Sequence, residues 1–287
     1  MTSFLFITDT HLGAAPMQFQ QQKGYPEKLH NIVDALKKFI ENHGKIDFIL
    51  HGGDMIDFTS EENIINASET FKFSVPLYLC LGNHDLTTKN AVSRWMSLAP
   101  QFFINNEPSS TLKNEDCVIH ITPNHWEETP FYWSKQQNPY LSGIQKYNLH
   151  NALITDTDLP HMILTHNPVF GLSTEQTGFA DPYHAPEDSF TSEINSFVSK
   201  YKNVKSVLGG HNHLNMRHNH NHVEYITASS LVESPFEFKL FEVSSNNLTM
   251  KTINLAQSID FDSVYDEQKS YVQGRPVDRT FEVTFKT

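Results

Sequence analysis

Residues 48–57 read FILHGGDMID, a short apolar run that changes abruptly to glycine and aspartate. An uninterrupted apolar run of this length, ended by turn residues, is typical of a strand that is buried on both faces. The same layout recurs at residues 4–11 (FLFITDTH) and 77–85 (LYLCLGNHD). In α/β proteins, ligands bind where parallel strands end. We therefore expect the polar residues of these segments to meet at one edge of a sheet.

The segments between these runs favour helices. Apolar residues recur at steps of three and four from Leu29 to Ile40, after Pro26 and before Gly44, which predicts an amphipathic helix. A second helix is expected near residues 61–71, and the alternation of strand and helix predicts an α/β fold. Further strands are predicted at residues 117–122, 162–165, 204–208, 223–227, 236–243, 248–253 and 280–285. We expect one domain at residues 1–255, followed by an extension, 256–287, whose role the sequence does not indicate.

The composition fits a folded protein, since 38% of the 287 residues are hydrophobic and 12% are aromatic. The net charge of −12 disfavours nucleic acid and anionic membranes as partners. No apolar run is long enough to span a membrane, and no signal peptide is recognisable at the N-terminus. We therefore expect a cytoplasmic protein without membrane association, and the sequence leaves a homo-oligomer open. Cys80 and Cys117 lie in apolar runs and are predicted to be buried, reduced thiols.

Five predicted strand ends carry oxygen and imidazole donors but no cysteine. This donor set suits Mn, Fe, Zn or Co, and it argues against a structural zinc site built from thiolates. The donors lie in the segments Asp9–His11, Gly53–Asp57, Gly82–Asp85, His166 and Gly210–His213.

These segments read D-x-H, G-D-x-x-D, G-N-H-D, a lone histidine and G-H-x-H, in that order over residues 9–213. One such element alone is a common polar turn, but the ordered set is a specific motif. With it, the chain resembles the calcineurin-like metallophosphoesterase superfamily. The resemblance implies a four-layer αββα sandwich, with two mixed sheets flanked by helices. It also implies hydrolysis of a phosphate ester at a centre of two divalent metal ions.

The resemblance also implies a role for each residue of the motif. Asp9, His11 and His213 would bind the first metal, Asn83, His166 and His211 the second, and Asp54 would bridge both. His84 would be catalytic and would stabilise or protonate the departing group, with Asp85 orienting its ring. Asp57 would accept a hydrogen bond from a ligand histidine.

Within the superfamily, the chain looks most similar to the class III cyclic-nucleotide phosphodiesterases and their bacterial relatives. The segment Thr165–Pro168 agrees, because that group often carries a proline near its lone histidine. The predicted substrate is therefore a nucleotide or another small phosphodiester. Purple acid phosphatases carry a tyrosine where this chain has Asp57, and protein phosphatases carry arginines beside the metals, whereas Leu86 follows Asp85 here.

Three alternatives stay open. One is a phosphomonoesterase. Another is a DNA or RNA nuclease of the same superfamily, since Asp9–Gly13 resembles the opening of the double-strand-break repair nucleases, although the acidic charge and scarce arginine oppose it. The third is a metal-binding scaffold without catalysis, which would be expected to have lost ligands that this chain retains.

Other histidines and one arginine could be mistaken for metal ligands or substrate-binding residues. His51 is interpreted as a satisfied polar residue near the site, and His218, His220 and His222 as one face of a solvated hairpin. Arg217 could reach a substrate phosphate or lie on the surface. The aromatic segment 123–147 is expected to form a lid or wall. His125 and Trp126 in this segment, and His184 outside it, are candidates for the pocket wall, although we favour a role in packing for them.

Overall fold

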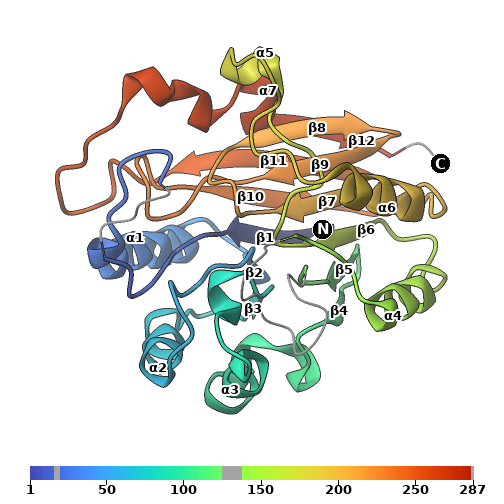
Figure 1. Cartoon of the computed structure of the whole chain (residues 1–287), viewed down its shortest axis with the longest axis horizontal. Coiled ribbons are helices and arrows are strands. Elements are labelled where there is room, and N and C mark those ends of the chain that lie inside the picture. The colour runs from blue at the N-terminus through green and yellow to red at the C-terminus, as the bar shows by residue number, and fades with distance from the viewer. Residues whose placement is uncertain (16–19, 125–137, 286–287) are drawn as a thin grey trace.

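A computed structural model describes residues 1–15, 20–124 and 138–285 and contains two six-stranded mixed sheets. The first has the order β12-β11-β10-β1-β2-β3 and the second β4-β5-β6-β7-β9-β8 (Figure 1). The first sheet contains β1 (Thr2–Ile7), β2 (Phe48–His51), β3 (Leu77–Leu79), β10 (Glu237–Val243), β11 (Asn247–Asn254) and β12 (Thr280–Thr284). The second contains β4 (Ser110–Lys113), β5 (Val118–Ile121), β6 (His161–Leu164), β7 (Val204–Gly209), β8 (Met216–His220) and β9 (Val223–Thr227).

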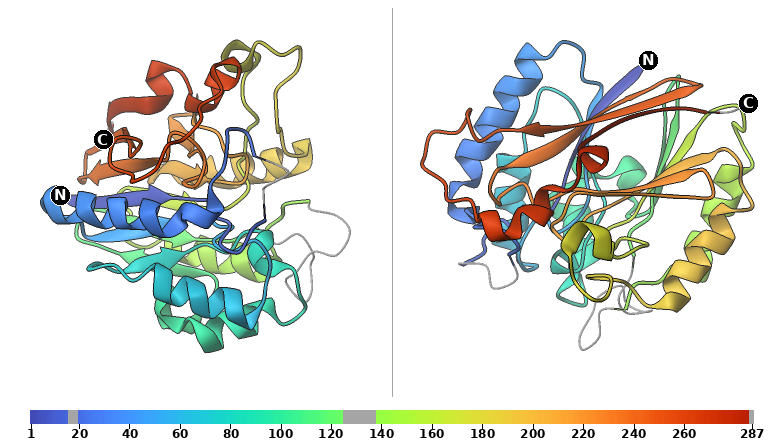
Figure 2. Two further views of the ribbon diagram at one scale, coloured as in Figure 1. Left: turned by 90° about the vertical axis from the view of Figure 1, so that its left-hand side faces the viewer. Right: turned by 90° about the horizontal axis from the view of Figure 1, so that it is seen from above.

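Helices cover the outer face of each sheet. The longer ones are α1 (Leu29–Asn42), α2 (Glu61–Thr70), α3 (Ala91–Leu98), α4 (Gly143–Leu153) and α6 (Asp188–Val198). Shorter helical segments are α5 (Thr174–Thr177), α7 (Pro276–Arg279) and the 3-10 turns η1 (Pro26–Lys28), η2 (His84–Leu86), η3 (Pro100–Phe102), η4 (Ile104–Asn106) and η5 (Glu267–Gln273). In the right-hand view of Figure 2, α1 and α6 lie on opposite sides of the strands.

The alternation of side chains along β1 shows why the molecule has four layers. Leu5 and Ile7 pack into a core shared with α1 and α2. Phe4 and Phe6 point the other way, into a core shared with β5, β6 and β7 of the second sheet. A further core lies between the outer face of the second sheet and helices α4 and α6. These three cores confirm the predicted αββα sandwich of two mixed sheets.

Strand direction places the loops of interest together. β1, β2 and β3 are parallel neighbours, as are β5, β6, β7 and β9. The carboxyl ends of parallel strands lie at the same edge of a sheet. The segments after β1, β2, β3, β6 and β7 are those that carry the candidate ligands.

Residues after 255 contribute a strand to the first sheet. β12 pairs antiparallel with β11, with Leu248 opposite Val283, so this segment adds an edge strand to the first sheet. Cys80 and Cys117 are buried and free of disulfides. No helix in the part of the chain that the structure describes is long and apolar enough to cross a membrane. Of the aromatic segment 123–147, residues 125–137, which include His125 and Trp126, lie outside the described ranges.

Candidate metal centre

Backbone hydrogen bonds tie the ligand-bearing loops to one another. The amide of Asp9 donates to the carbonyl of Gly53 at 2.9 Å, and the amide of His11 donates to the carbonyl of Asp54 at 3.0 Å. In the second sheet, the amide of Gly210, after β7, donates to the carbonyl of His166, after β6, at 2.8 Å. The loops therefore hold their side chains in fixed relative positions, which a preformed site requires.

Most of the candidate ligands have a left-handed backbone. The φ angles are 54° at Asp9, 41° at His11, 52° at Asp54, 69° at His211 and 57° at His213. This conformation costs residues other than glycine about 1 kcal/mol or more each, and such strain concentrates at functional sites. The sharp turns aim the side chains out of the strand direction and toward a common point.

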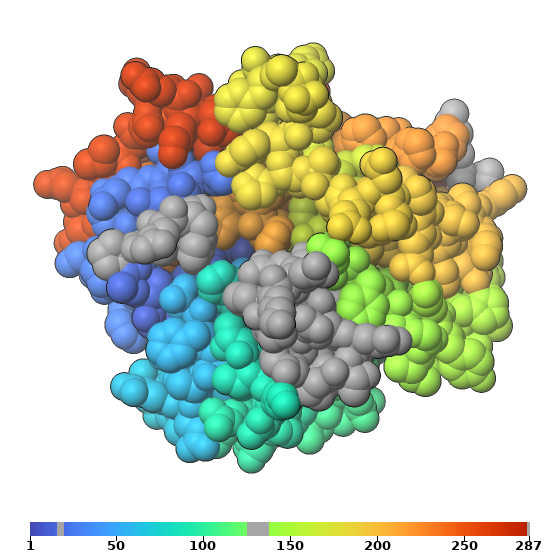
Figure 3. Space-filling model, viewed as in Figure 1, coloured from blue at the N-terminus to red at the C-terminus, as the bar shows by residue number. Residues whose placement is uncertain are grey.

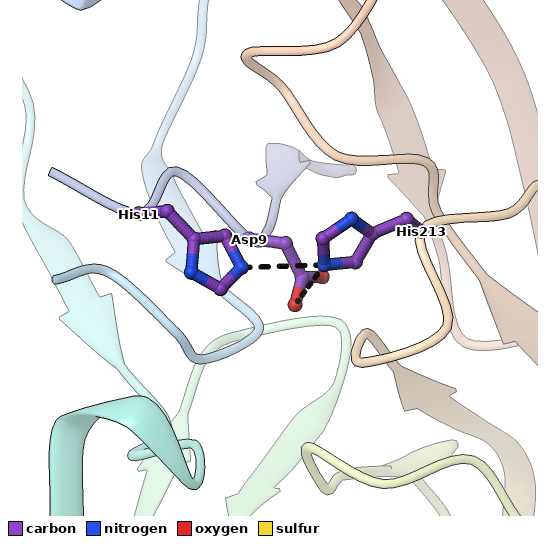
Figure 4. Close-up of side chains that lie close together, drawn as sticks. All are labelled: Asp9, His11 and His213. Atoms are coloured by element: carbon purple, nitrogen blue, oxygen red, sulfur yellow. Dashed lines mark hydrogen bonds and ion pairs between the residues drawn. The ribbon is translucent and has the colours of Figure 1, made fainter. Parts of the chain in front are cut away.

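The first cluster consists of Asp9, His11 and His213, whose donor atoms all lie within 4.8 Å of one another. Figure 4 shows the three side chains pointing at one another from the segments after β1 and β7. The Nε2 atoms of His11 and His213 are 3.2 Å apart, and His213 Nε2 lies 3.5 Å from an Asp9 carboxylate oxygen. Two imidazole nitrogens and one carboxylate oxygen, all buried, form a donor set that suits a divalent transition metal.

The second cluster consists of Asp54, His166 and His211, with Asn83 among them. The side-chain oxygen of Asn83 lies 3.2 Å from His166 Nε2 and 3.2 Å from His211 Nδ1. One carboxylate oxygen of Asp54, Oδ2, is 3.2 Å from His166 Nε2 and 4.0 Å from His11 Nε2. Asp54 therefore stands between the two clusters, where a bridging ligand is needed.

Both clusters fit divalent cations in charge as well as in geometry. Burial acts to raise the pKa of Asp9, but the neighbouring His213 more than offsets it and holds that pKa at about 2. Burial likewise opposes ionisation of Asp54, and His166 and His84 nevertheless lower its pKa. Burial lowers the pKa of His211 to about 3, so that its imidazole is neutral. Burial acts to lower the pKa of His166 and of His213, but Asp54 raises that of His166 to about 9, and Glu233 and Asp9 raise that of His213. Bound cations would replace the protons on these two rings, because ionised carboxylates and neutral imidazoles are the forms that bind metals.

His84 lies beside the two clusters. Its ring is edge-on to that of His11, with centroids 4.7 Å apart, and its amide donates to Asp54 Oδ1 at 2.8 Å. Burial acts to lower the pKa of His84, but the nearby carboxylates of Asp54 and Asp57 raise it to about 9. A protonated imidazole at this place can donate a proton to a departing oxygen.

The sequence predicted that Asp85 orients the ring of His84. In the structure, the orienting contact comes from Asp57 instead. His84 Nδ1 lies 2.7 Å from the backbone carbonyl of Asp57 and 3.4 Å from its carboxylate. The Asp85 carboxylate accepts hydrogen bonds from the amides of Met55, Ile56 and Gly82. Asp85 thus holds the loop that carries Asp54 against the loop that carries Asn83.

Asp57, which was expected to accept a hydrogen bond from a ligand histidine, also faces His11. Its carboxylate oxygen is 3.3 Å from His11 Nδ1. His11, Asp57 and His84 therefore form a third group of closely spaced donors. Because the Nδ1 atoms of both histidines face Asp57, we interpret this group as an orienting device for His11 and His84.

Two residues that support the candidate ligands were not predicted from the sequence. Glu233, which is 1% exposed, pairs with His213 Nδ1 and accepts hydrogen bonds from the amides of Gln21 and Gln22. The side-chain oxygen of Asn124 accepts the amides of His166 and Asn167 at 2.7 and 2.8 Å. The sequence feature that could have indicated Glu233 is its position as an acidic residue directly after the apolar pair Leu231–Val232.

His51, Arg217 and His184, which could be mistaken for residues of the site, make contacts outside the two clusters. His51 Nε2 lies 3.1 Å from the hydroxyl of Thr10, and burial lowers its pKa to about 3, as expected of a satisfied polar residue. Arg217 pairs with Glu224 at 2.8 Å and stacks over Phe281. His184 lies near Gln21 at the rim of the first cluster, with its Nε2 atom 3.5 Å from the side-chain nitrogen of Gln21.

Comparison with known proteins agrees with this arrangement. Residues 2–215 match the family described as calcineurin-like phosphoesterase. The chain belongs to this family. The matched segment contains every residue of both clusters, and the protein is accordingly a metal-dependent phosphoesterase. No match was found among curated proteins.

Solved structures share the calcineurin-like fold with this chain at low sequence identity. A dimetal phosphatase from Danio rerio has a TM-score of 0.69 and 13% identity, with 99% of each chain covered. GAP50 of Plasmodium, described as the anchor in the inner membrane complex, has a TM-score of 0.66 and 12% identity, covering 100% of this chain and 89% of its own. A purple acid phosphatase from yellow lupin has a TM-score of 0.58 and 16% identity, covering 100% of this chain and 57% of its own.

We expect Glu233→Gln to weaken metal binding by about tenfold or more, because it removes the charge behind His213 while keeping the shape of the side chain. The measurement is calorimetric titration of the metal-free calcineurin-like domain with Mn²⁺. Glu242→Gln is the matched control, since Glu242 lies on the neighbouring β10 and contacts Thr249. An unchanged affinity in Glu233→Gln would show that Glu233 does not support a ligand.

Proposed function

We propose that this phosphoesterase hydrolyses a phosphodiester, and that its substrate is a nucleotide or another small diester of the kind that class III cyclic-nucleotide phosphodiesterases cleave. The proposal rests on the juxtaposition of the two donor clusters, joined by Asp54, with His84 directly beside them. Asp9, His11 and His213 would hold one metal ion, and Asn83, His166 and His211 the other.

The pairing of positive side chains favours a diester over a monoester. A phosphodiester carries one negative charge, whereas a monoester carries nearly two at neutral pH. Among the described residues, the largest electrostatic influences on Asp9 and Asp54 come from histidines, with Asp54 also acting on Asp9, and neither lysine nor arginine ranks with them. The arginines that follow the last ligands pair instead with carboxylates: Arg217 with Glu224, Arg275 with Asp278, and Arg279 with Glu237. The second charge of a monoester would therefore have little side-chain compensation.

The chemistry divides between the cations and the protein. Two divalent ions, when bound, would neutralise phosphate oxygens and activate a water molecule for in-line attack. The protein orients the ligands through Asp57, Glu233 and Asn124, which contact His11, His213 and the backbone of His166. His84 holds its Nδ1 against the Asp57 carbonyl, so that a proton for the leaving oxygen would be delivered from Nε2.

A non-catalytic scaffold is the second candidate. One structural neighbour, GAP50, is described as an anchor, so the fold by itself does not require turnover. The retention of His84 in contact with Asp57 favours catalysis, because a metal-binding scaffold has no use for a positioned proton donor.

A paired assay tests the proposal. Purified protein with Mn²⁺ is given bis(p-nitrophenyl) phosphate and p-nitrophenyl phosphate, and kcat/KM is measured for each. We expect the diester to be preferred by about tenfold or more, a difference of about 1.4 kcal/mol or more in transition-state stabilisation. Preference for the monoester would replace the phosphodiesterase by a phosphatase, and no turnover with metal bound would favour the scaffold.

A further inference from the structure

Asn215 connects the metal-ligand loop to the C-terminal extension. It lies two residues after His213 and is fully buried. Its amide donates to the carbonyl of Val272 at 2.9 Å, and its carbonyl accepts from the side-chain amide of Gln176 at 2.8 Å. Gln176 in turn donates to the carbonyl of Tyr271 at 2.9 Å. In Figure 3 the red C-terminal segment touches the yellow segment around α5 at the top of this face.

The side chain of Asn215 is held between Lys239 and Glu237. Its oxygen accepts a hydrogen bond from Nζ of Lys239 at 2.9 Å. Its side-chain nitrogen donates to the carboxylate of Glu237 at 2.7 Å. Lys239 and Glu237 are 0% and 1% exposed. Because buried polar groups are costly without hydrogen-bond partners, both must keep their partners, and this fixes the amide between them.

The partners of this buried pair come from the extension. Arg279 forms two hydrogen bonds with Glu237, at 3.0 and 2.6 Å. Asp278 is fully buried and pairs with Arg275 at 2.9 Å. The Asp278 carbonyl also accepts from Lys239 at 3.4 Å. Residues 272–279 thus supply both backbone and charge to the surroundings of Asn215.

Gly274 marks the closest approach of the extension to the ligand loop. Its φ angle is +79°, a region that favours glycine. A Cβ at this position would lie 2.7 Å from the backbone oxygen of Asn215 and 2.8 Å from Asp278 Cβ. The contact therefore tolerates no side chain without moving Asn215 or the extension.

We propose that residues 272–279 act as a clamp that positions His211 and His213 for metal binding through Asn215. The extension is then part of the metal centre's support rather than an appendage, and Asn215, Gly274 and Arg279 are positioning residues. The inference rests on the proposed function in taking His211 and His213 as ligands.

The test compares two variants of the clamp with one control in the same extension. Gly274→Ala pushes on Asn215 directly, and Arg279→Gln removes the charge that neutralises Glu237. Val283→Ala is the control, because Val283 packs on β12 against the core between the sheets, away from Asn215. Mn²⁺ affinity is measured by calorimetry, kcat and KM by turnover of the preferred substrate, and stability by thermal unfolding.

We expect both clamp variants to weaken metal affinity by about tenfold or more, a size typical of losing support behind a ligand. They should lower kcat at saturating metal more than they raise KM, whereas Val283→Ala should lower the unfolding temperature without changing either quantity. Arg279→Lys should restore part of the affinity. Wild-type affinity in Gly274→Ala and Arg279→Gln would overturn the clamp.

Amide hydrogen exchange in the metal-free protein separates this proposal from the proposed function. Faster exchange confined to residues 210–215 in both clamp variants, and absent in Val283→Ala, is expected of a clamp. If wild-type protein bound no metal while this pattern held, the proposed function would fail and the clamp would stand. Unchanged exchange in a wild-type protein that binds metal would remove the clamp alone.

Discussion

We expect Asp54→Ala to abolish metal binding and activity together, with kcat/KM falling by a factor of about 10³ or more. The reason is the position of this carboxylate. Its Oδ2 faces His166 at 3.2 Å and His11 at 4.0 Å, so that it is shared by both clusters. Without it, one fewer negative charge would hold two dications at short separation. Metal content per protein chain and kcat/KM are measured on the same preparation.

The control for Asp54→Ala is Asp47→Ala. The Asp47 carboxylate also accepts a backbone hydrogen bond, from Ser3 at 2.9 Å, but lies away from the clusters. Since Asp54→Ala leaves the amide of His84 without its acceptor, it should also cost about 1–3 kcal/mol of stability. Circular dichroism must therefore confirm that the variant is folded at the assay temperature. Two metals retained in folded Asp54→Ala would show that Asp54 does not bridge.

His84→Ala should lower kcat by a factor of about 10²–10⁴ while both metals stay bound. His84 contacts Asp54 through its amide, which alanine keeps, and its ring contacts Asp57 rather than the second cluster. The loss should depend on the leaving group. A nitrophenolate leaves readily without a proton, whereas an alkoxide requires one, so the defect should be larger for a methyl or nucleoside leaving group.

Two variants sharpen the measurement on His84. Asp57→Asn removes the carboxylate behind both His84 and His11, so it should lower kcat and also weaken metal binding. His84→Gln keeps a hydrogen-bond donor but cannot supply a proton at neutral pH. A defect in His84→Ala that is equal for all leaving groups would exclude proton donation. Loss of one metal in that variant would make the group of His11, Asp57 and His84 a metal site.

Local sequence was sufficient for most of the strands, although β4 was not predicted, and it indicated the candidate ligand set. An apolar run ended by polar donors is visible without any tertiary information, and β1, β2, β3 and β7 lie at such runs. Helix α1 was equally visible, because apolar residues at steps of three and four had to cover one face of the sheet. Helix α4 was not foreseen, since its buried side chains are only Gln145, Leu149 and Leu153.

Tertiary structure decided which groups support those ligands. Asp85 is next to His84 in sequence, but both lie in the 3-10 turn η2, where successive side chains point about 120° apart. Asp85 therefore turns inward to the amides of Met55 and Ile56, and the distant Asp57 reaches the His84 ring.

The sequence by itself determined the kinds of donor and their order along the chain, because each donor follows a strand whose burial is encoded locally. It could not determine the partners of those donors, since Glu233 and Asn124 approach them only when the two sheets pack and loops distant in sequence meet. The same holds for residues 272–279. Their contacts with the ligand loop depend on buried polar and charged side chains that are distant in sequence and pair only in the folded protein. Such pairing leaves no periodic pattern in the sequence.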